Sequence, residues 1–235
     1  MAFLRLDKIL SEAGVASRRE AKAWLKAGRV TVDGTAVHGG EKKFDPGVSV
    51  ICVDGHKITH AKYRYFIMNK PVGVITATED RSQETVIDLL PPELRRLELF
   101  PVGRLDKDTS GLLILTNDGA YAHSVISPKK HVAKVYLAGV DAPLQSGDAL
   151  RFSEGIVLAD GTECLPGSLE ILSKYRCRVT IHEGKYHQVR RMLAACGKHV
   201  LTLHREAIGG LRLDEKLPHG EVRELLSGER EWVFL

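Results

Sequence analysis

The feature that most constrains the fold is a charged turn enclosed by two apolar segments near the middle of the chain. Residues 99–102 and 112–115 are short and apolar, which predicts two buried strands, and residues 117–119 (Asn-Asp-Gly) form a turn after the second. Residues 104–106 (Arg-Leu-Asp) lie between them, with a glycine on either side. A carboxylate at the mouth of a buried strand pair is costly unless a cation meets it. From the pattern alone, this is either a charged hairpin loop or a site that another molecule approaches closely.

Composition excludes several classes of protein. The 235 residues are 43% hydrophobic and 27% charged, as in globular proteins of one or two domains. No apolar run approaches the roughly 20 residues of a membrane span, and the first residues do not form a signal peptide. The four cysteines are far apart, without Cys-x-x-Cys, and the ten histidines lack the spacing of a metal site. We therefore expect a cytoplasmic protein with no membrane partner, no metal and no disulfide framework.

The net charge of +4 is unevenly distributed. Residues 1–62 contain 11 Lys and Arg against 7 Asp and Glu, whereas residues 63–235 contain 23 of each. A basic segment attached to a neutral body indicates a nucleic-acid-binding module joined to a domain that performs chemistry. An ordinary solvated basic surface is the alternative.

The basic segment contains signals for two helices and a strand. Residues 4–14 have amphipathic helical spacing, and Ser17 with Glu20 forms the capping box of a second helix that Gly28 ends. Residues 30–34 (Val-Thr-Val-Asp-Gly) predict a strand that enters a tight turn. Five cations cluster on and around the second helix: Arg18, Arg19, Lys22, Lys26 and Arg29.

This arrangement resembles the S4 RNA-binding domain over residues 3–58. The resemblance implies that the five basic residues contact phosphates of folded RNA, which gives affinity and salt dependence but little reading of sequence. The alternative is a small structural domain with a charged face.

The central segment also carries a resemblance. Gly-Arg-Leu-Asp-x-x-Thr-Ser-Gly-Leu-Leu-x-Leu-Thr-Asn-Asp-Gly, residues 103–119, resembles the signature of RNA pseudouridine synthases, in the branch that acts on small-subunit (16S) rRNA. The resemblance implies that Asp106, rather than Asp108 or Asp118, is the catalytic nucleophile. It also implies that Arg104 fills the space left in the RNA when the target base leaves its stack.

Two further motifs extend the resemblance. Residues 134–140 predict a strand, whose Lys-x-Tyr implies that Tyr136 stacks on the flipped uracil. Residues 187–192 (His-Gln-Val-Arg-Arg-Met) begin a helix that starts at Gln188 and ends near Gly197. The resemblance implies that Arg190 pairs with Asp106 and that Met192 and Leu193 form a wall of the uracil pocket. Without the resemblance, the pattern would indicate that Tyr136 is a core residue and that Arg190 and Arg191 lie on a solvated face.

The remaining pattern predicts further elements of a catalytic domain. We expect two short strands around Asn69-Lys70-Pro71, with Lys70 either on RNA or at the surface, and a short helix over residues 86–90. Strands are predicted over residues 165–172 and 175–181, and residues 200–203 and 232–234 contribute closing strands and turns.

We therefore predict an α+β protein with an S4-like domain at residues 1–58, a linker at 59–62 and a catalytic domain at 63–235 built on a mixed, mostly antiparallel sheet. The expected reaction converts a uridine of 16S rRNA, free or in an assembling small subunit, to pseudouridine. It is redox-neutral, and the chain lacks the glycine motifs that hold phosphates of nucleotide cofactors, so we expect no cofactor. We also expect a monomer.

Three alternatives stay open. The chain could modify large-subunit rRNA, because sibling enzymes share the three motifs. It could be a non-catalytic RNA-binding factor of ribosome assembly that keeps the fold. A metal-dependent RNA hydrolase, with Asp106 and Asp108 as metal ligands, is the third.

Overall fold

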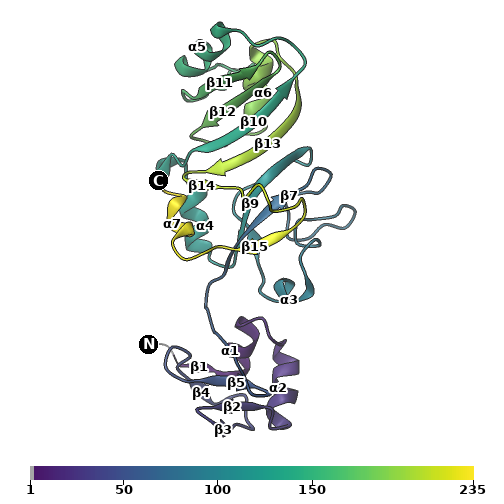
Figure 1. The fold of residues 1–235 in the computed structure, drawn as a ribbon, viewed down its shortest axis with the longest axis vertical. Helices are drawn as coiled ribbons and strands as arrows, with labels where there is room; N and C mark the ends of the chain where they lie inside the picture. The colour runs from purple at the N-terminus through teal and green to yellow at the C-terminus, as the bar shows by residue number, and fades with distance from the viewer. Residues whose placement is uncertain (1–2) are drawn as a thin grey trace. The chain divides into compact units, whose positions relative to one another are not determined.

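The computed structural model describes residues 3–235, which form two compact units (Figure 1). The first contains the described residues up to Arg64 together with Leu90–Leu99, and the second contains Tyr65–Leu89 and Phe100–Leu235. Among the described residues, no helix is both long and apolar enough to cross a membrane.

The first unit packs two helices against a small sheet. Its elements are β1 (Leu4–Arg5), α1 (Leu6–Glu12), α2 (Arg18–Lys26), β2 (Val30–Val32), β3 (Thr35–Ala36), β4 (Lys43–Phe44), β5 (Ile51–Val53), β6 (His56–Lys57) and α3 (Pro92–Arg95). The sheet order is β3-β2-β5-β6, and β1 pairs with β4. The first helix begins at Leu6, two residues later than the pattern predicts, because Leu4 and Arg5 pair with β4. The predicted capping box is confirmed, since Ser17 and Glu20 each accept the other's backbone N–H.

A segment from the middle of the chain completes this unit. The predicted helix over residues 86–90 is wrong: these residues form turns, and α3 begins at Pro92, where the ring of a proline suits the first helical turn. A Cβ added to Gly14 would lie 2.9 Å from a methyl of Leu97, so the segment packs closely on the end of α1. Arg96 also forms an ion pair with Glu20 at 3.4 Å.

The second unit is built on one large sheet. Its strands are β7 (Tyr65–Lys70), β8 (Phe100–Pro101), β9 (Thr109–Thr116), β10 (Lys134–Val140), β11 (Ser168–Ser173), β12 (Arg176–Ile181), β13 (Val200–Ile208), β14 (Leu211–Arg212) and β15 (Val222–Glu224). The order is β11-β12-β10-β13-β9-β7-β15. The pairing of β13 with β9 is parallel and the other pairings are antiparallel. The predicted mixed, mostly antiparallel sheet is confirmed.

Helices surround the sheet of this unit: α4 (Gly119–Ile126), the 3-10 helix η1 (Pro128–Lys130), α5 (Ser146–Glu154), α6 (Gln188–Ala195) and α7 (Glu229–Trp232). The predicted alternation on β12 is confirmed, because Cys177, Val179 and Ile181 are buried. The two strands expected around Pro71 are one strand, β7, which ends at Lys70 because proline cannot continue the ladder. Of the closing strands and turns expected at residues 232–234, the structure has no strand: α7 ends at Trp232 and a turn follows.

The parallel pairing of β9 with β13 depends on a glycine. Arg205 lies opposite Gly111, whose φ is +108°. A Cβ at position 111 would lie 2.3 Å from the carbonyl oxygen of Arg205, far inside van der Waals contact. Only glycine at position 111 can adopt this backbone conformation and also allow the other strand to approach so closely.

We predict that Gly111→Ala disrupts this join. Gly197→Ala is the matched control, because Gly197 also has positive φ (+74°) but no described atom lies within 4 Å of the added Cβ. The control should lose ~1 kcal/mol of unfolding free energy from backbone strain alone, whereas Gly111→Ala should lose more than ~3 kcal/mol. Urea unfolding measures both, and equal losses would contradict the steric account.

Candidate active site

A cavity of about 1000 Å³ opens at the junction of the two halves of the large sheet. The turn before β9 contributes Arg104, Leu105 and Asp106, and β10 contributes Lys134 and Tyr136. Residues 182–187 before α6, Arg205 on β13, residues 75–77 and residues 125–128 also line it. The fold thus brings together residues that are far apart in the sequence.

Contacts to its backbone hold the Asp106 turn in place. The Thr76 hydroxyl donates to the carbonyl oxygen of Leu105 at 2.7 Å and accepts from the Leu105 N–H at 3.2 Å. The Lys70 ammonium donates to the carbonyl oxygen of Asp106 at 3.1 Å. These contacts leave the carboxylate of Asp106 unused, so the turn is positioned without occupying its side chain.

Lys70 holds the turn that carries Asp106, a position that the sequence patterns did not predict. Its side chain is fully buried at the end of β7, and its ammonium also donates to the carbonyl oxygens of Pro71 and Thr109, both at 2.9 Å. Three carbonyl acceptors match the three donors of an ammonium group. Neither expected role, RNA contact or surface residue, is correct. Its position at the end of an otherwise buried strand was the available signal, because such a lysine must find acceptors.

The carboxylate of Asp106 faces the cavity. Its side chain is 33% exposed, and Nε2 of His187 lies 3.4 Å from its Oδ1. That distance is too long for a strong hydrogen bond. The carboxylate is therefore accessible to a molecule in the cavity.

The expected pair of Arg190 with Asp106 is not formed among the described residues. The Arg190 guanidinium instead meets the carboxylate of Asp108 at 2.9 Å and donates to the Asp108 carbonyl oxygen at 3.1 Å. It also donates to the carbonyl oxygen of Val200 at 3.2 Å. The turn directs Asp106 into the cavity and Asp108 toward α6, so the nearer carboxylate takes the cation. The neighbouring Arg191 does not pair with Asp106 either, because its guanidinium pairs with the carboxylate of Asp160 at 2.5 Å.

Tyr136 is one of the residues that line the cavity. It lies on β10 and is 8% exposed, between Val179 on β12 and Arg205 on β13. Met192 and Leu193, expected as pocket walls, are fully buried and do not line the cavity. Their face of α6 packs inward, and Val189 lines the cavity instead.

Two cations line the inner part of the cavity, Arg205, which is buried, and Lys134, which is partly buried. Arg205 is 2% exposed, its Nε donates to the carbonyl oxygen of Leu112 at 2.8 Å, and its Nη2 has no partner among the described atoms. Burial and the charge of Arg205 lower the pKa of Lys134 to about 8. The floor of the cavity is therefore positive, which suits an anionic ligand.

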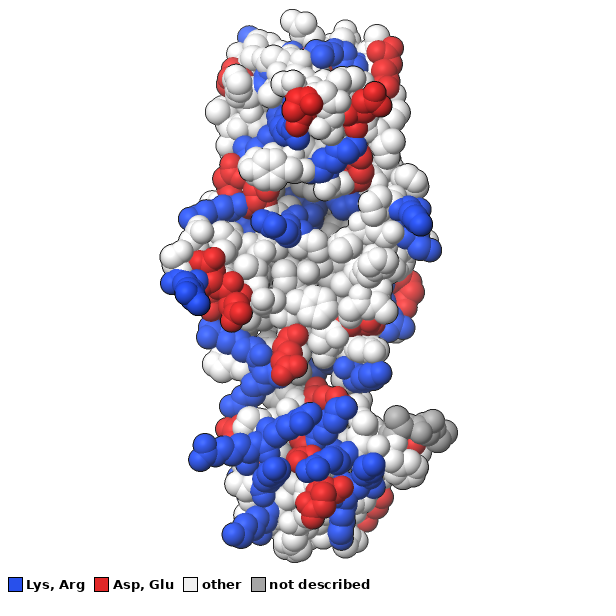
Figure 2. Space-filling model, turned by 180° about the vertical axis from the view of Figure 1, so that it is seen from behind, with Lys and Arg blue, Asp and Glu red and all other residues white. Residues whose placement is uncertain are grey.

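The predicted RNA-binding residues of the first unit are all exposed. Arg29 is engaged by protein groups: it pairs with Asp54 and lies over the ring of Trp24 at 4.8 Å. None of the other four, Arg18, Arg19, Lys22 and Lys26, forms an ion pair with a described residue. Figure 2 shows Lys and Arg gathered on one face of this unit. The four unpaired cations are therefore available for phosphates.

Comparisons with known proteins assign the family. Residues 64–195 match the model of the RNA pseudouridylate synthase family, and residues 4–42 match the S4 domain. The chain is 44% identical to ribosomal small subunit pseudouridine synthase A of Vibrio cholerae and 39% identical to that of Escherichia coli K12, each over 96% of this chain and 97% or 98% of the relative. It is 43% identical to an uncharacterized RNA pseudouridine synthase of Bacillus subtilis, over 96% of both chains.

A solved pseudouridylate synthase has a similar structure, with a TM-score of 0.70 and 36% identity over 98% of this chain and 99% of the other. The chain belongs to the RNA pseudouridine synthase family. It is an isomerase with an S4 RNA-binding domain, as the sequence resemblance implied.

Stability against pH tests the buried ammonium of Lys70. Burial lowers the pKa of Lys70 from its ordinary value of 10.5 to about 8. Between these values the unfolded chain binds more protons than the folded protein, so this group makes stability rise with pH. Lys70→Met lacks the titrating group and leaves three carbonyls unpaired. We expect the unfolding free energy of wild type minus that of the variant to increase from pH 8 toward 10.5, measured by urea unfolding.

Lys107→Met is the control, because Lys107 is exposed and lies on the same turn. Its difference from wild type should not follow this pH dependence. A Lys70→Met difference that stays constant across the window would contradict the burial effect.

Proposed function

We propose that this protein converts a specific uridine of 16S rRNA to pseudouridine, with Asp106 as the nucleophile. The observation that carries the proposal is the accessible carboxylate of Asp106 in a large cavity that Tyr136 also lines. The named small-subunit relatives, at 38–44% identity over almost the whole chain, support the choice of RNA.

The chemistry accounts for the proposed roles. Pseudouridine forms when the C1′–N1 bond breaks, the uracil turns, and C5 bonds to C1′; N1 ends protonated and the C5 proton is lost, with no change in oxidation state. An ionised carboxylate can attack C1′ of the ribose or C6 of the base. Tyr136 would hold the flipped ring and is a candidate to carry the proton. Arg104, exposed at the edge of the cavity, would occupy the space that the base leaves.

The contacts of Arg190 give it a positioning role in the free enzyme. By meeting both the side chain and the backbone of Asp108, it ties the catalytic turn to α6. The same contacts disfavour metal-dependent hydrolysis, because Asp108 already has a cationic partner and does not present a second free carboxylate beside Asp106. A non-catalytic assembly factor is disfavoured by the presence of Asp106 and Tyr136 in one cavity.

The S4 unit would supply affinity through phosphate contacts of Arg18, Arg19, Lys22 and Lys26. We propose that the protein acts as a monomer in the cytoplasm, on rRNA that is free or part of an assembling small subunit.

Asp106→Asn tests the nucleophile. The change keeps the shape of the side chain and removes its charge, so pseudouridine formation should fall at least ~1,000-fold, with RNA affinity nearly unchanged. The product is measured in small-subunit rRNA transcribed from the source organism's gene. Asp108→Asn is the control. It weakens the contact with Arg190 and lowers turnover somewhat, but the variant should still form pseudouridine. Asp106→Asn turnover within about tenfold of wild type would refute the assignment.

Salt dependence tests the basic surface. A variant with Arg18, Arg19, Lys22 and Lys26 all changed to Gln should release fewer counterions on binding, so the slope of log affinity against log salt should fall by up to ~3. A control variant, Lys174→Gln with Lys216→Gln, changes exposed cations of the second unit and should keep the slope. An unchanged slope in the quadruple variant would count against the S4 surface.

A further inference from the structure

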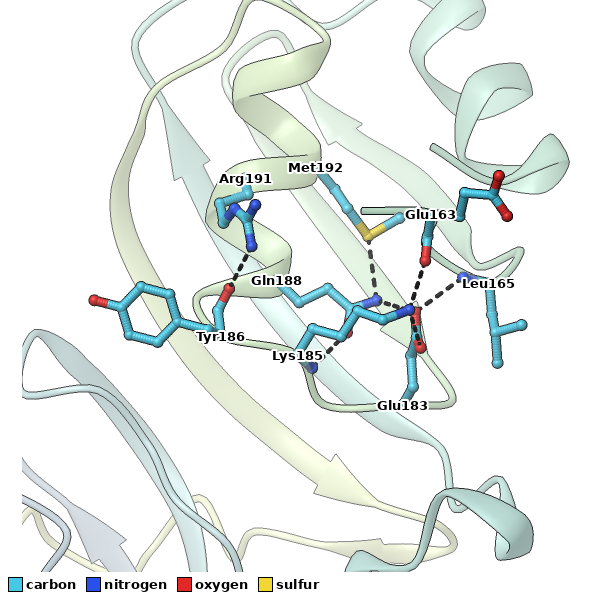
Figure 3. A network of polar contacts seen from close by, with 8 residues as sticks. All are labelled: Glu163, Leu165, Glu183, Lys185, Tyr186, Gln188, Arg191 and Met192. Atoms are coloured by element: carbon cyan, nitrogen blue, oxygen red, sulfur yellow. Dashed lines mark hydrogen bonds and ion pairs between the residues drawn. The ribbon is translucent and has the colours of Figure 1, made fainter. Parts of the chain in front are cut away.

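Tyr186 is an exposed aromatic residue that the proposed mechanism does not use. Its side chain is 75% exposed, the highest value for any Phe, Tyr or Trp among the described residues, although it lines the active-site cavity. Figure 3 shows its ring directed away from the polar network behind it. Single exposed aromatic residues are common, so exposure alone decides nothing.

The ring of Tyr186 does not stand alone. It stacks on the ring of His187, with centroids 3.9 Å apart and planes at 18°. His187 in turn places Nε2 3.4 Å from the carboxylate of Asp106. Two nearly parallel rings therefore lead from the proposed nucleophile toward solvent, along the wall of one cavity.

A partly buried polar network holds the loop that carries these rings (Figure 3). The Glu183 carboxylate, whose side chain is 10% exposed, accepts from the Leu165 N–H at 2.9 Å, the Lys185 ammonium at 2.6 Å and the Gln188 amide at 2.8 Å. Gln188 also accepts from the Lys185 N–H at 2.9 Å. Every member is paired with another, so the loop is fixed at both ends.

The backbone between the rings and α6 is fixed as well. His187 has a φ of +48°, in the left-handed region, which is uncommon for residues other than glycine. The Arg191 guanidinium donates to the carbonyl oxygen of Tyr186 at 3.4 Å (Figure 3). An aromatic surface that is ordered before binding costs little conformational entropy when a ligand stacks on it.

We propose that Tyr186, backed by His187, is a stacking platform for the base of a nucleotide next to the target uridine. The inference rests on the proposed function, because that base arrives with the substrate RNA. Flipping the target out of its stack leaves its neighbours without a partner on one side, and aromatic side chains replace such stacking for any base. The exposed cations Arg104 and Lys107 line the same cavity and suit the phosphates that accompany the base.

Fluorescence of a single-stranded oligouridylate with one 2-aminopurine tests the platform directly. The full-length protein is used in an Asp106→Asn background, so binding is read without turnover. We expect the 2-aminopurine to be quenched on binding, and the quenching to be lost with Tyr186→Ala but kept with Tyr186→Phe. Affinity should fall about 5- to 150-fold in the alanine variant. Tyr175→Ala, at another exposed tyrosine, is the control and should change neither quantity.

A second measurement isolates the base. If Tyr186 stacks on a base, Tyr186→Ala should have no effect on an oligonucleotide in which the 2-aminopurine is replaced by an abasic nucleotide flanked by uridines. Absence of quenching in the Asp106→Asn background, equal quenching by the alanine variant, or an equal loss of affinity with and without the base would each overturn the platform. None of these readouts needs pseudouridine to form, so failure of the platform is distinct from failure of the proposed activity.

Discussion

The catalytic unit depends on the parallel contact between β9 and β13, where the backbone of Arg205 passes against Gly111. On one side of this join lie β10 and Tyr136, and on the other lies the turn that ends in β9 and carries Asp106. The cavity exists because the two halves of the sheet meet here and the catalytic turn projects from the seam. The close approach of two backbones at this join therefore sets how far Asp106, the proposed nucleophile, lies from Tyr136. Only glycine at position 111 permits that approach.

The charges around the seam are divided between structure and chemistry. The Lys70 ammonium and the two Nη groups of Arg190 bind backbone carbonyls and Asp108, whereas the carboxylate of Asp106 receives no strong hydrogen bond. Cations that could have neutralised Asp106 directly instead hold the turn beneath and beside it. This arrangement holds Asp106 by its backbone and leaves its side chain accessible, as its proposed role as the nucleophile requires.

Sequence patterns predicted the elements of the site better than the contacts within it. The strand over residues 134–140 and the helix start at Gln188 agree with the structure, because each has a clear periodicity or a defined boundary. The partner of Arg190 was not predictable, because the choice between two carboxylates two residues apart depends on the direction of a turn. Met192 and Leu193 are apolar in either role, so only packing shows that they lie in the core. The helix at residues 146–154 was missed, since its few apolar residues give little pattern.

Residues 90–99 belong to the first compact unit although they are flanked in sequence by the second. Leu97 is 4% exposed and reaches the end of α1 at Gly14, and Arg96 pairs with Glu20. The N-terminal unit is thus assembled from two pieces of chain, and no single cut in the gene separates it from the rest. Recombination that exchanged only the first 64 residues would place a helix from another protein against residues 90–99. We therefore expect the two segments to co-evolve.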